Sequence, residues 1–109
     1  MSSSELPWVN EVHLVGRVTS TADDVELPSG DVLTRFRIVV PRLKPTTKTT
    51  VDTIDLITVK AGLSKRARSL AVGDCVEVQG AMRRRFWKAG ASVASRVEVE
   101  VTTMTKVVL

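Results

Sequence analysis

The chain has 109 residues, enough for one domain, and its hydrophobic content of 43% excludes an intrinsically disordered protein. Its single cysteine excludes an intrachain disulfide and a cysteine-rich metal site. No apolar run approaches the roughly 18 residues of a membrane span, and the N-terminus has neither the basic nor the apolar region of a signal peptide. The expected location is therefore the cytoplasm.

Three strands are predicted in the first part of the chain. Val and Thr supply more than a quarter of all residues, and their branched side chains favour strands. Residues 9–18 alternate between an apolar and a mixed face, and residues 32–40 do so again after a turn over residues 27–31. Residues 41–50 form a basic, Thr-rich loop whose two prolines interrupt pairing, and a third strand follows over residues 51–60.

One helix and two further strands are predicted in the second part. Residues 61–72 carry apolar side chains at helical spacing, and Gly73 supplies a helix stop. Strand four runs over residues 75–87 with Met82 facing inward, and strand five runs over residues 93–108 after a tight turn. Three strands, one helix and two strands follow one another in the oligonucleotide/oligosaccharide-binding (OB) fold. The sequence therefore predicts an all-β, five-stranded OB-fold barrel with one α-helix between strands 3 and 4.

The basic residues are segregated from the acidic ones. The windows 32–51, 56–73 and 78–97 contain no acidic residue, yet they hold 14 of the 16 Lys and Arg residues. Segregation of this kind indicates a surface that faces a polyanion. The charge pattern alone leaves a second interpretation open, in which the basic surface is solvated and has no partner.

The densest local pattern is the segment Met82–Lys88. Period-two alternation places Arg83, Arg85 and Trp87 on one face of the strand. An indole offers every base a flat surface for stacking, and guanidinium groups beside it can contact phosphates or stack themselves. The alternative is structural: Trp87 packs under the following loop, and the arginines are ordinary strand charges.

Further basic residues extend this pattern in one interpretation. Arg35 and Arg37 share the outward face of strand two and either continue the basic track or pair with acids such as Asp52 or Asp55. The 41–50 loop either closes over a bound strand or is simply solvated. The predicted nucleic-acid-binding residues are Trp87, Arg83, Arg85, Arg35, Arg37, Lys48 and Lys88.

The remaining aromatic residues and the single histidine indicate no chemistry. Phe36 faces inward and is predicted to belong to the core, whereas Trp8 is predicted to cover the barrel end or a subunit contact. His13 lacks the companion ligands of a metal site. No Ser or Cys has an evident base partner, and no phosphate-binding glycine motif occurs. We therefore expect no enzymatic activity, no metal and no cofactor.

Four segments resemble motifs of the bacterial single-stranded DNA-binding protein family, an OB-fold family. They are residues 9–18 (VNEVHLVGRV), 28–30 (PSG), 72–80 (VGDCVEVQG) and 83–87 (RRRFW), in the family's order. The resemblance implies an N-terminal extension over residues 1–8 and an OB-fold single-stranded DNA-binding domain over residues 9–109. It also implies binding of single-stranded DNA without sequence preference, in DNA replication, recombination or repair at the nucleoid, and a homo-oligomer that is a tetramer rather than a dimer.

The chain departs from the family's main, replication-supporting type in its aromatic residues. The third-strand stacking positions correspond to Thr53 and Val59, and only Trp87 stands at a family stacking position. Residues 102–109 carry one positive charge and no acid, so they match the end of strand five and not the family's acidic docking tip. These departures predict a tailless, accessory-type member that does not recruit repair proteins through its C-terminus.

Three alternative functions stay open at this point. A primosome-type OB protein is also short, tailless and dimeric, and it binds both single strands and replication proteins. An RNA-binding OB module uses the same stacking and phosphate contacts, which do not separate RNA from DNA unless the 2′-hydroxyl is contacted. The scarcity of stacking aromatics favours a protein-interaction scaffold with little nucleic-acid affinity.

Overall fold

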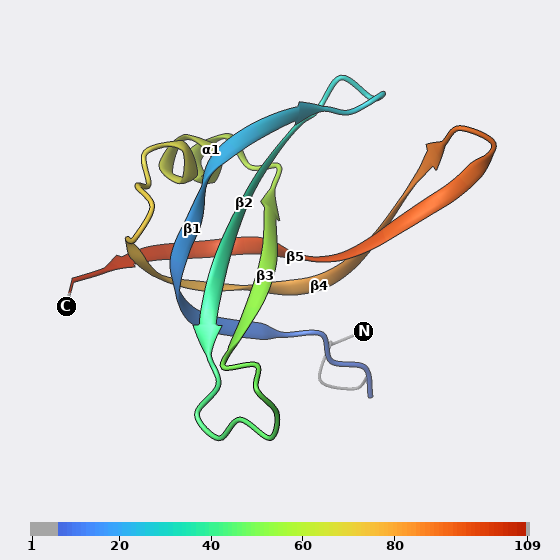
Figure 1. Cartoon of the computed structure of the whole chain (residues 1–109). Coiled ribbons are helices and arrows are strands. Elements are labelled where there is room, and N and C mark those ends of the chain that lie inside the picture. Colours follow the sequence, from blue (N-terminus) through green and yellow to red (C-terminus); the bar gives the residue numbers. More distant parts are fainter. Residues whose placement is uncertain (1–6, 109) are drawn as a thin grey trace.

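Six elements follow one another along the chain in the predicted order. In the computed structural model, which describes residues 7–108, they are β1 (Val12–Glu26), β2 (Val32–Pro41), β3 (Val51–Thr58), α1 (Ala61–Arg68), β4 (Cys75–Ala89) and β5 (Ser92–Val107) (Figure 1). The predicted N-terminal extension of residues 1–8 lies outside the described residues, except for Pro7 and Trp8. Within residues 7–108, no helix is both long and apolar enough to cross a membrane.

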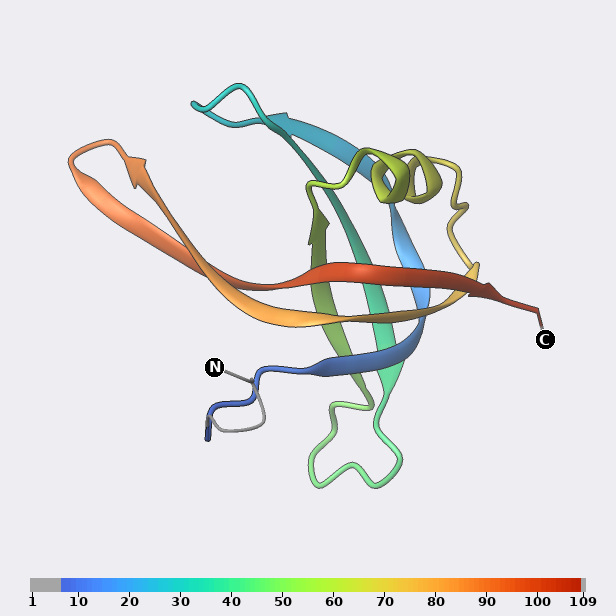
Figure 2. The ribbon, with the colours of Figure 1, turned by 180° about the vertical axis from the view of Figure 1, so that it is seen from behind.

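The five strands close into a barrel in the order β1-β2-β3-β5-β4. All neighbouring pairs are antiparallel except β3 and β5, which run parallel. β1 closes the barrel because Val12 to Arg17 pair with β4, whereas the residues from Arg17 onward pair with β2. A closed five-stranded barrel with one helix between β3 and β4 is the OB fold, so the predicted fold class is confirmed (Figures 1 and 2).

The barrel interior is filled by the apolar side chains that alternate along each strand. Successive side chains of a strand point to opposite faces, so one set from each strand meets inside. Phe36 is 4% exposed, which confirms its predicted place in the core, and Leu63 and Ala67 of α1 join the same cluster. Each large aliphatic side chain buried in this way contributes about 1.5–3 kcal/mol. The other core members are Val18, Ile38, Leu56, Val76, Val78, Val99, Val101 and Met104.

β1 is longer than predicted, because it continues to Glu26 and does not end at residue 18. Residues 19–26 are mostly polar and lack the alternation on which the prediction depended. Register shifts between Val18 and Ser20 and between Ser20 and Asp23 bend this part of the strand while it stays paired with β2. The bend places polar side chains of β1 beside the outer face of β2.

α1 is shorter than predicted, since it ends at residue 68 and not at residue 72. The amides of Ser69 and Leu70 donate to carbonyl groups only three residues back, which tightens and ends the helix. The Asp74 carboxylate then accepts a hydrogen bond of 2.9 Å from the amide of Ala71 and holds the next turn. Gly73, with a φ of 98°, belongs to this turn and is not the helix stop that the sequence indicates.

The β4–β5 hairpin extends beyond the barrel as a two-stranded arm, residues 82–97 (Figures 1 and 2). The prediction that Met82 faces the interior is wrong. Met82 pairs with the core residue Val99, but its own side chain is 51% exposed because the hairpin leaves the barrel at this point. The strand periodicity continues along the arm, whereas the barrel that would bury one of its faces does not.

Two predictions at the ends of the barrel are also corrected. Pro41 does not interrupt pairing, because it is the last residue of β2 and pairs with Val51 of β3. A proline is tolerated at that place in a strand, where no further ladder bond is needed from it. Trp8 is 77% exposed, so it does not cover the barrel end within the chain, and its role in a subunit contact stays a prediction.

Candidate nucleic-acid interface

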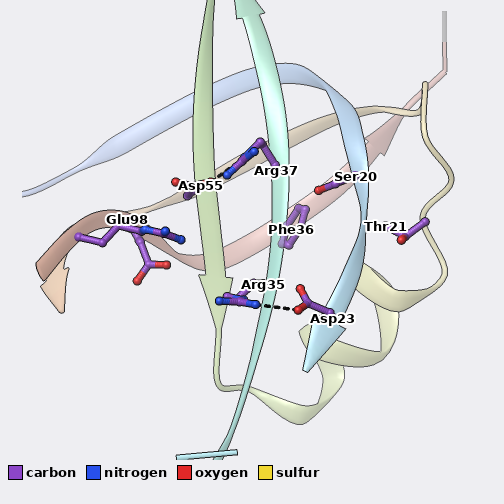
Figure 3. Close-up of a pocket in the computed structure, with 9 residues that line it drawn as sticks. Ser20, Thr21, Asp23, Arg35, Phe36, Arg37, Asp55 and Glu98 are labelled. Atoms are coloured by element: carbon purple, nitrogen blue, oxygen red, sulfur yellow. Dashed lines mark hydrogen bonds and ion pairs between the residues drawn. The ribbon is translucent and has the colours of Figure 1, made fainter. Parts of the chain in front are cut away.

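An open groove of about 370 Å³ lies along the outer side of β2 (Figure 3). Its walls come from the polar half of β1, from β2, from the middle of β3 and from the base of the arm on β5. Three arginines and three acids dominate the lining: Arg35, Arg37, Arg96, Asp23, Asp55 and Glu98. The groove is therefore strongly charged, and its electrostatic character depends on which of these groups pair with one another.

Two of the groove arginines are paired with carboxylates directly across the sheet. Arg35 donates to Asp23 at 2.8 Å, and Arg37 donates to Asp55 at 2.8 Å (Figure 3). The hydrogen bond from Arg35 lowers the pKa of the Asp23 carboxyl below its ordinary value, and the same bond raises the pKa of Arg35. Asp23 therefore stays charged at neutral pH, and an anion that approaches Arg35 competes with it for the guanidinium.

A buried carboxylate joins the groove to the arm. The side chain of Glu98 is 1% exposed and accepts hydrogen bonds from Arg85 at 2.8 and 3.3 Å. The Arg85 guanidinium in turn lies 4.9 Å from the ring centroid of Trp87, a cation–π contact. Since Glu98 would be a costly buried charge without its partner, Arg85 is held in place, and its guanidinium orients the indole.

Trp87 and the groove belong to one surface, which we call the groove face. Arg83, Arg85 and Trp87 alternate along β4, and Arg96 lies opposite Arg85 in the β4–β5 ladder and also lines the groove. Trp87 is 37% exposed, so part of its ring is accessible beside the arginine that it contacts. An accessible aromatic ring next to a row of guanidinium groups on an OB barrel is the arrangement expected of a surface for single-stranded nucleic acid.

Comparison with known proteins leads to the same class. A model of the single-strand binding protein family matches residues 9–107. The chain belongs to this family. A search of curated proteins finds no match. Among solved structures, the Plasmodium falciparum SSB in complex with single-stranded DNA aligns with a TM-score of 0.74, at 19% identity over 94% of this chain and 97% of that chain, which shows a shared fold.

Two predicted site residues of this family member lie away from the groove face. Lys88 follows Trp87 in the strand and therefore points to the opposite face of the arm. Lys48 lies in the exposed loop of residues 42–50, which contributes no side chain to the groove. The structure brings the other five together on one surface: Trp87, Arg83, Arg85, Arg35 and Arg37.

Sequence reasoning missed the groove residues of β1, among them Asp23, and two charged residues of β5, Arg96 and Glu98. Arg96 is exposed and, within residues 7–108, forms no ion pair, so its charge is available to a ligand. It lies in an acid-free window of the sequence, but its neighbours on β4 become known only from the strand register. Glu98 was missed because a single acid in a strand gives no sign that it is buried.

Proposed function

We propose that the protein binds single-stranded DNA without sequence preference, by stacking bases on Trp87 and placing phosphates along the groove arginines. The observation that carries the proposal is that the indole and the arginines share one continuous face. Every base has a flat face and every nucleotide a phosphate, so such a surface is tolerant of sequence. Membership of the single-strand binding protein family and the single-stranded DNA in the Plasmodium falciparum complex support the same ligand.

The proposal extends to the protein's role. Residues 9–109 act as the binding domain, with residues 1–8 as an extension, and the protein works at the nucleoid in the cytoplasm in DNA replication, recombination or repair. It binds and does not catalyse, without a cofactor. Thr53 in β3 and Val59 just after its end are exposed, and they correspond to positions where the main type of the family stacks bases. With one indole on the groove face, we assign the chain to an accessory type that depends more on phosphate contacts.

Binding is expected to be selective for single strands and sensitive to salt. Each phosphate neutralised on a single strand adds a slope of about −0.7 to log K against log salt concentration, so roughly four contacts give a slope near −3. The available cations include Arg96, Lys44 and Lys48, none of which forms an ion pair within residues 7–108. The test is a titration of poly-dT, poly-U and duplex DNA at one salt concentration, repeated for poly-dT across a salt series.

Each result of that titration separates the proposal from an alternative. Poly-dT binding that exceeds both poly-U and duplex binding supports the proposal. Higher affinity for poly-U than for poly-dT indicates an RNA-binding module, because contact with the 2′-hydroxyl is what distinguishes RNA from DNA. Absence of poly-dT binding at low salt indicates a protein-interaction scaffold.

Neutralising Asp55 is expected to tighten binding to poly-dT. In Asp55→Asn the Arg37 guanidinium loses its carboxylate partner and becomes available to a phosphate, so the affinity at low salt rises and the salt slope steepens by up to about 0.7. Glu26→Gln is the matched control, because it removes the same charge from an exposed carboxylate outside the groove that forms no ion pair within residues 7–108. An equal gain in both variants would show that only net charge matters and that Arg37 is not at the interface.

We also propose that the protein is a homo-oligomer, a tetramer in preference to a dimer, assembled through β1. Among residues 7–108, Val12 to Gly16 pair only with β4, because the pairing of β1 with β2 begins at Arg17. This leaves one edge of β1 open, and Val15 beside it is 46% exposed. Symmetric pairing of two such edges would satisfy the open ladder and join two groove faces for a long strand.

Light scattering at micromolar concentration is expected to give a mass that is a multiple of the 11.9 kDa chain. A tetramer supports the assembly proposed here, and a dimer is the mass expected of a primosome-type protein. A mass of one chain would contradict the proposed contact. Val15→Glu provides the control, because like charges facing each other across the symmetric strand pair should shift the mass downward.

A further inference from the structure

The arm has a second face that the groove does not use. Along β4, Arg84, Phe86 and Lys88 alternate with the residues of the groove face, and the register places Val97, Ser95 and Val93 opposite them on β5. We call this set, together with Met82, the back face of the arm. Phe86 is 63% exposed and Val93 is 68% exposed. Met82 and Val97 of the same face are exposed too, so the ring belongs to a patch of exposed apolar side chains, and such patches mark contact surfaces.

The back face carries positive charge that no acid of the described residues offsets by an ion pair. Arg84 donates to the hydroxyl of Ser95 at 3.2 Å, a neutral partner, and Lys88 forms no ion pair within residues 7–108. On the groove face, by contrast, Arg83 and Arg85 are paired with Glu100 and Glu98. The cations of the back face are therefore more available to a phosphate than the two paired arginines on the other side of the same strand.

We propose that the back face is a second contact surface for single-stranded DNA, with Phe86 as its stacking platform and Arg84 and Lys88 as its phosphate contacts. Phe86 stands between two cations at the spacing of alternate strand residues, as Trp87 does beside Arg85 on the groove face. The inference rests on the proposed function. A strand that leaves Trp87 passes around the arm, which is one two-stranded ribbon thick, and reaches Phe86.

The charge of the back face favours single-stranded DNA over a second copy of the chain as its ligand. Two back faces in contact would bring Arg84 and Lys88 of one chain against the same cations of the other, without an acid among the seven residues. Like charges facing each other across an interface oppose association, whereas a polyanion with flat bases complements both features of the surface. The arm is thus used on both faces by one DNA strand, and the length of DNA bound per chain exceeds what the groove face covers.

The test compares Phe86→Ala with wild type on a series of dT oligomers, spanning the roughly 4–16 nucleotides of one OB fold and continuing to longer lengths. Phe86→Ala is expected to leave the affinity for the shortest binding oligomers unchanged. It should lower the affinity for longer oligomers about fivefold or more, which is the effect of one lost stacking contact. Phe86→Tyr should restore the affinity, because it keeps the ring. The number of nucleotides covered per chain on poly-dT should fall in Phe86→Ala and recover in Phe86→Tyr.

Val93→Ala is the matched control, because it shortens an exposed apolar side chain on the same face without removing an aromatic ring. It should lower the affinity for long oligomers clearly less than Phe86→Ala does, because no stacking ring is lost. Equal losses in Val93→Ala and Phe86→Ala would overturn the proposal in favour of a general apolar contact. A lower mass of Phe86→Ala in light scattering, with unchanged binding per chain, would identify the back face as a subunit contact.

The remaining outcomes separate this inference from the proposed function. Wild-type binding to long dT oligomers with no loss in Phe86→Ala, at an unchanged melting temperature, overturns the second surface and leaves the groove proposal intact. No binding of any dT oligomer by wild type overturns both. A 5-iodouracil oligomer adds a direct measurement, because the residue cross-linked by light can be identified by fragmenting the labelled peptide. The cross-link should fall on Trp87 with short oligomers and also on Phe86 only when the oligomer is long enough to pass around the arm.

Discussion

Replacing Trp87 with alanine is expected to lower the affinity for poly-dT roughly five- to 150-fold, which corresponds to about 1–3 kcal/mol for each base stacked. The loss should be large because Trp87 is the one indole of the groove face and third-strand positions Thr53 and Val59 offer no replacement ring. Trp87→Ala is also expected to lower the affinity for the shortest dT oligomers, whereas Phe86→Ala is not. The length dependence therefore assigns each ring to its own face.

The measurement combines a titration with the melting temperature of the variant, because Trp87 also contacts Arg85 in the arm. Fluorescence gives a second readout: bases stacked on the indole should quench its emission, and Trp8→Phe removes the other tryptophan from the signal. Poly-dT binding by the Trp8→Phe protein without any change in Trp87 emission would place the indole outside the site. Arg85→Ala is a poorer test of the stacking site, because it leaves the buried Glu98 carboxylate without its partner. The expected loss of about 3–5 kcal/mol in stability would confound the measured affinity.

Gly80→Ala is expected to destabilise the barrel by about 3 kcal/mol or more, the upper end of the range for overpacked sites. A Cβ at Gly80 would lie 1.9 Å from the backbone oxygen of Glu100 and 2.8 Å from its carbonyl carbon. Neither atom can move without opening the β4–β5 ladder, whose register shifts at this point. Thermal unfolding should show a melting temperature lower by about 4–8 °C for each kcal/mol lost.

Gly62→Ala provides the control for Gly80. A Cβ at Gly62 would meet no atom within 4 Å, and the residue lies in α1, where alanine is preferred to glycine by roughly 0.5–1 kcal/mol. This variant should therefore melt at or slightly above the wild-type temperature. A Gly80→Ala protein as stable as Gly62→Ala would mean that the close approach of β4 to β5 at the barrel rim does not exist.

The fold was predictable where the signal is local. Apolar alternation marks β2, β3 and the parts of β4 and β5 that belong to the barrel, because one face of each is buried there. The second half of β1 escaped prediction, since residues 19–26 are polar and are strands only because β2 pairs with them. The helix end escaped for a similar reason: Leu70 packs against the core without being helical, so its apolar spacing imitated another helical turn.

The site was predictable in part. Alternation along one strand suffices to place Arg83, Arg85 and Trp87 on one face, and the structure confirms that placement. The sequence left open whether Arg35 and Arg37 pair with acids across the sheet. Both do: Arg37 pairs with Asp55, one of the two candidate partners, and Arg35 pairs with Asp23. Asp52, the other candidate partner, pairs instead with Arg42 at the end of the loop.

By itself, the sequence determined the fold class, the family and the face on which the indole stands, because all three follow from residue types and from a periodicity that operates within single strands. Only the tertiary structure decided which Lys and Arg side chains are paired with a carboxylate and which are available to a ligand. Arg35 and its partner Asp23 are 12 residues apart and come from two strands, and Arg85 and Glu98 are 13 apart across the hairpin. The Coulomb energy of a pair falls with distance, so a carboxylate brought to hydrogen-bonding range by strand register outweighs the charges along the chain.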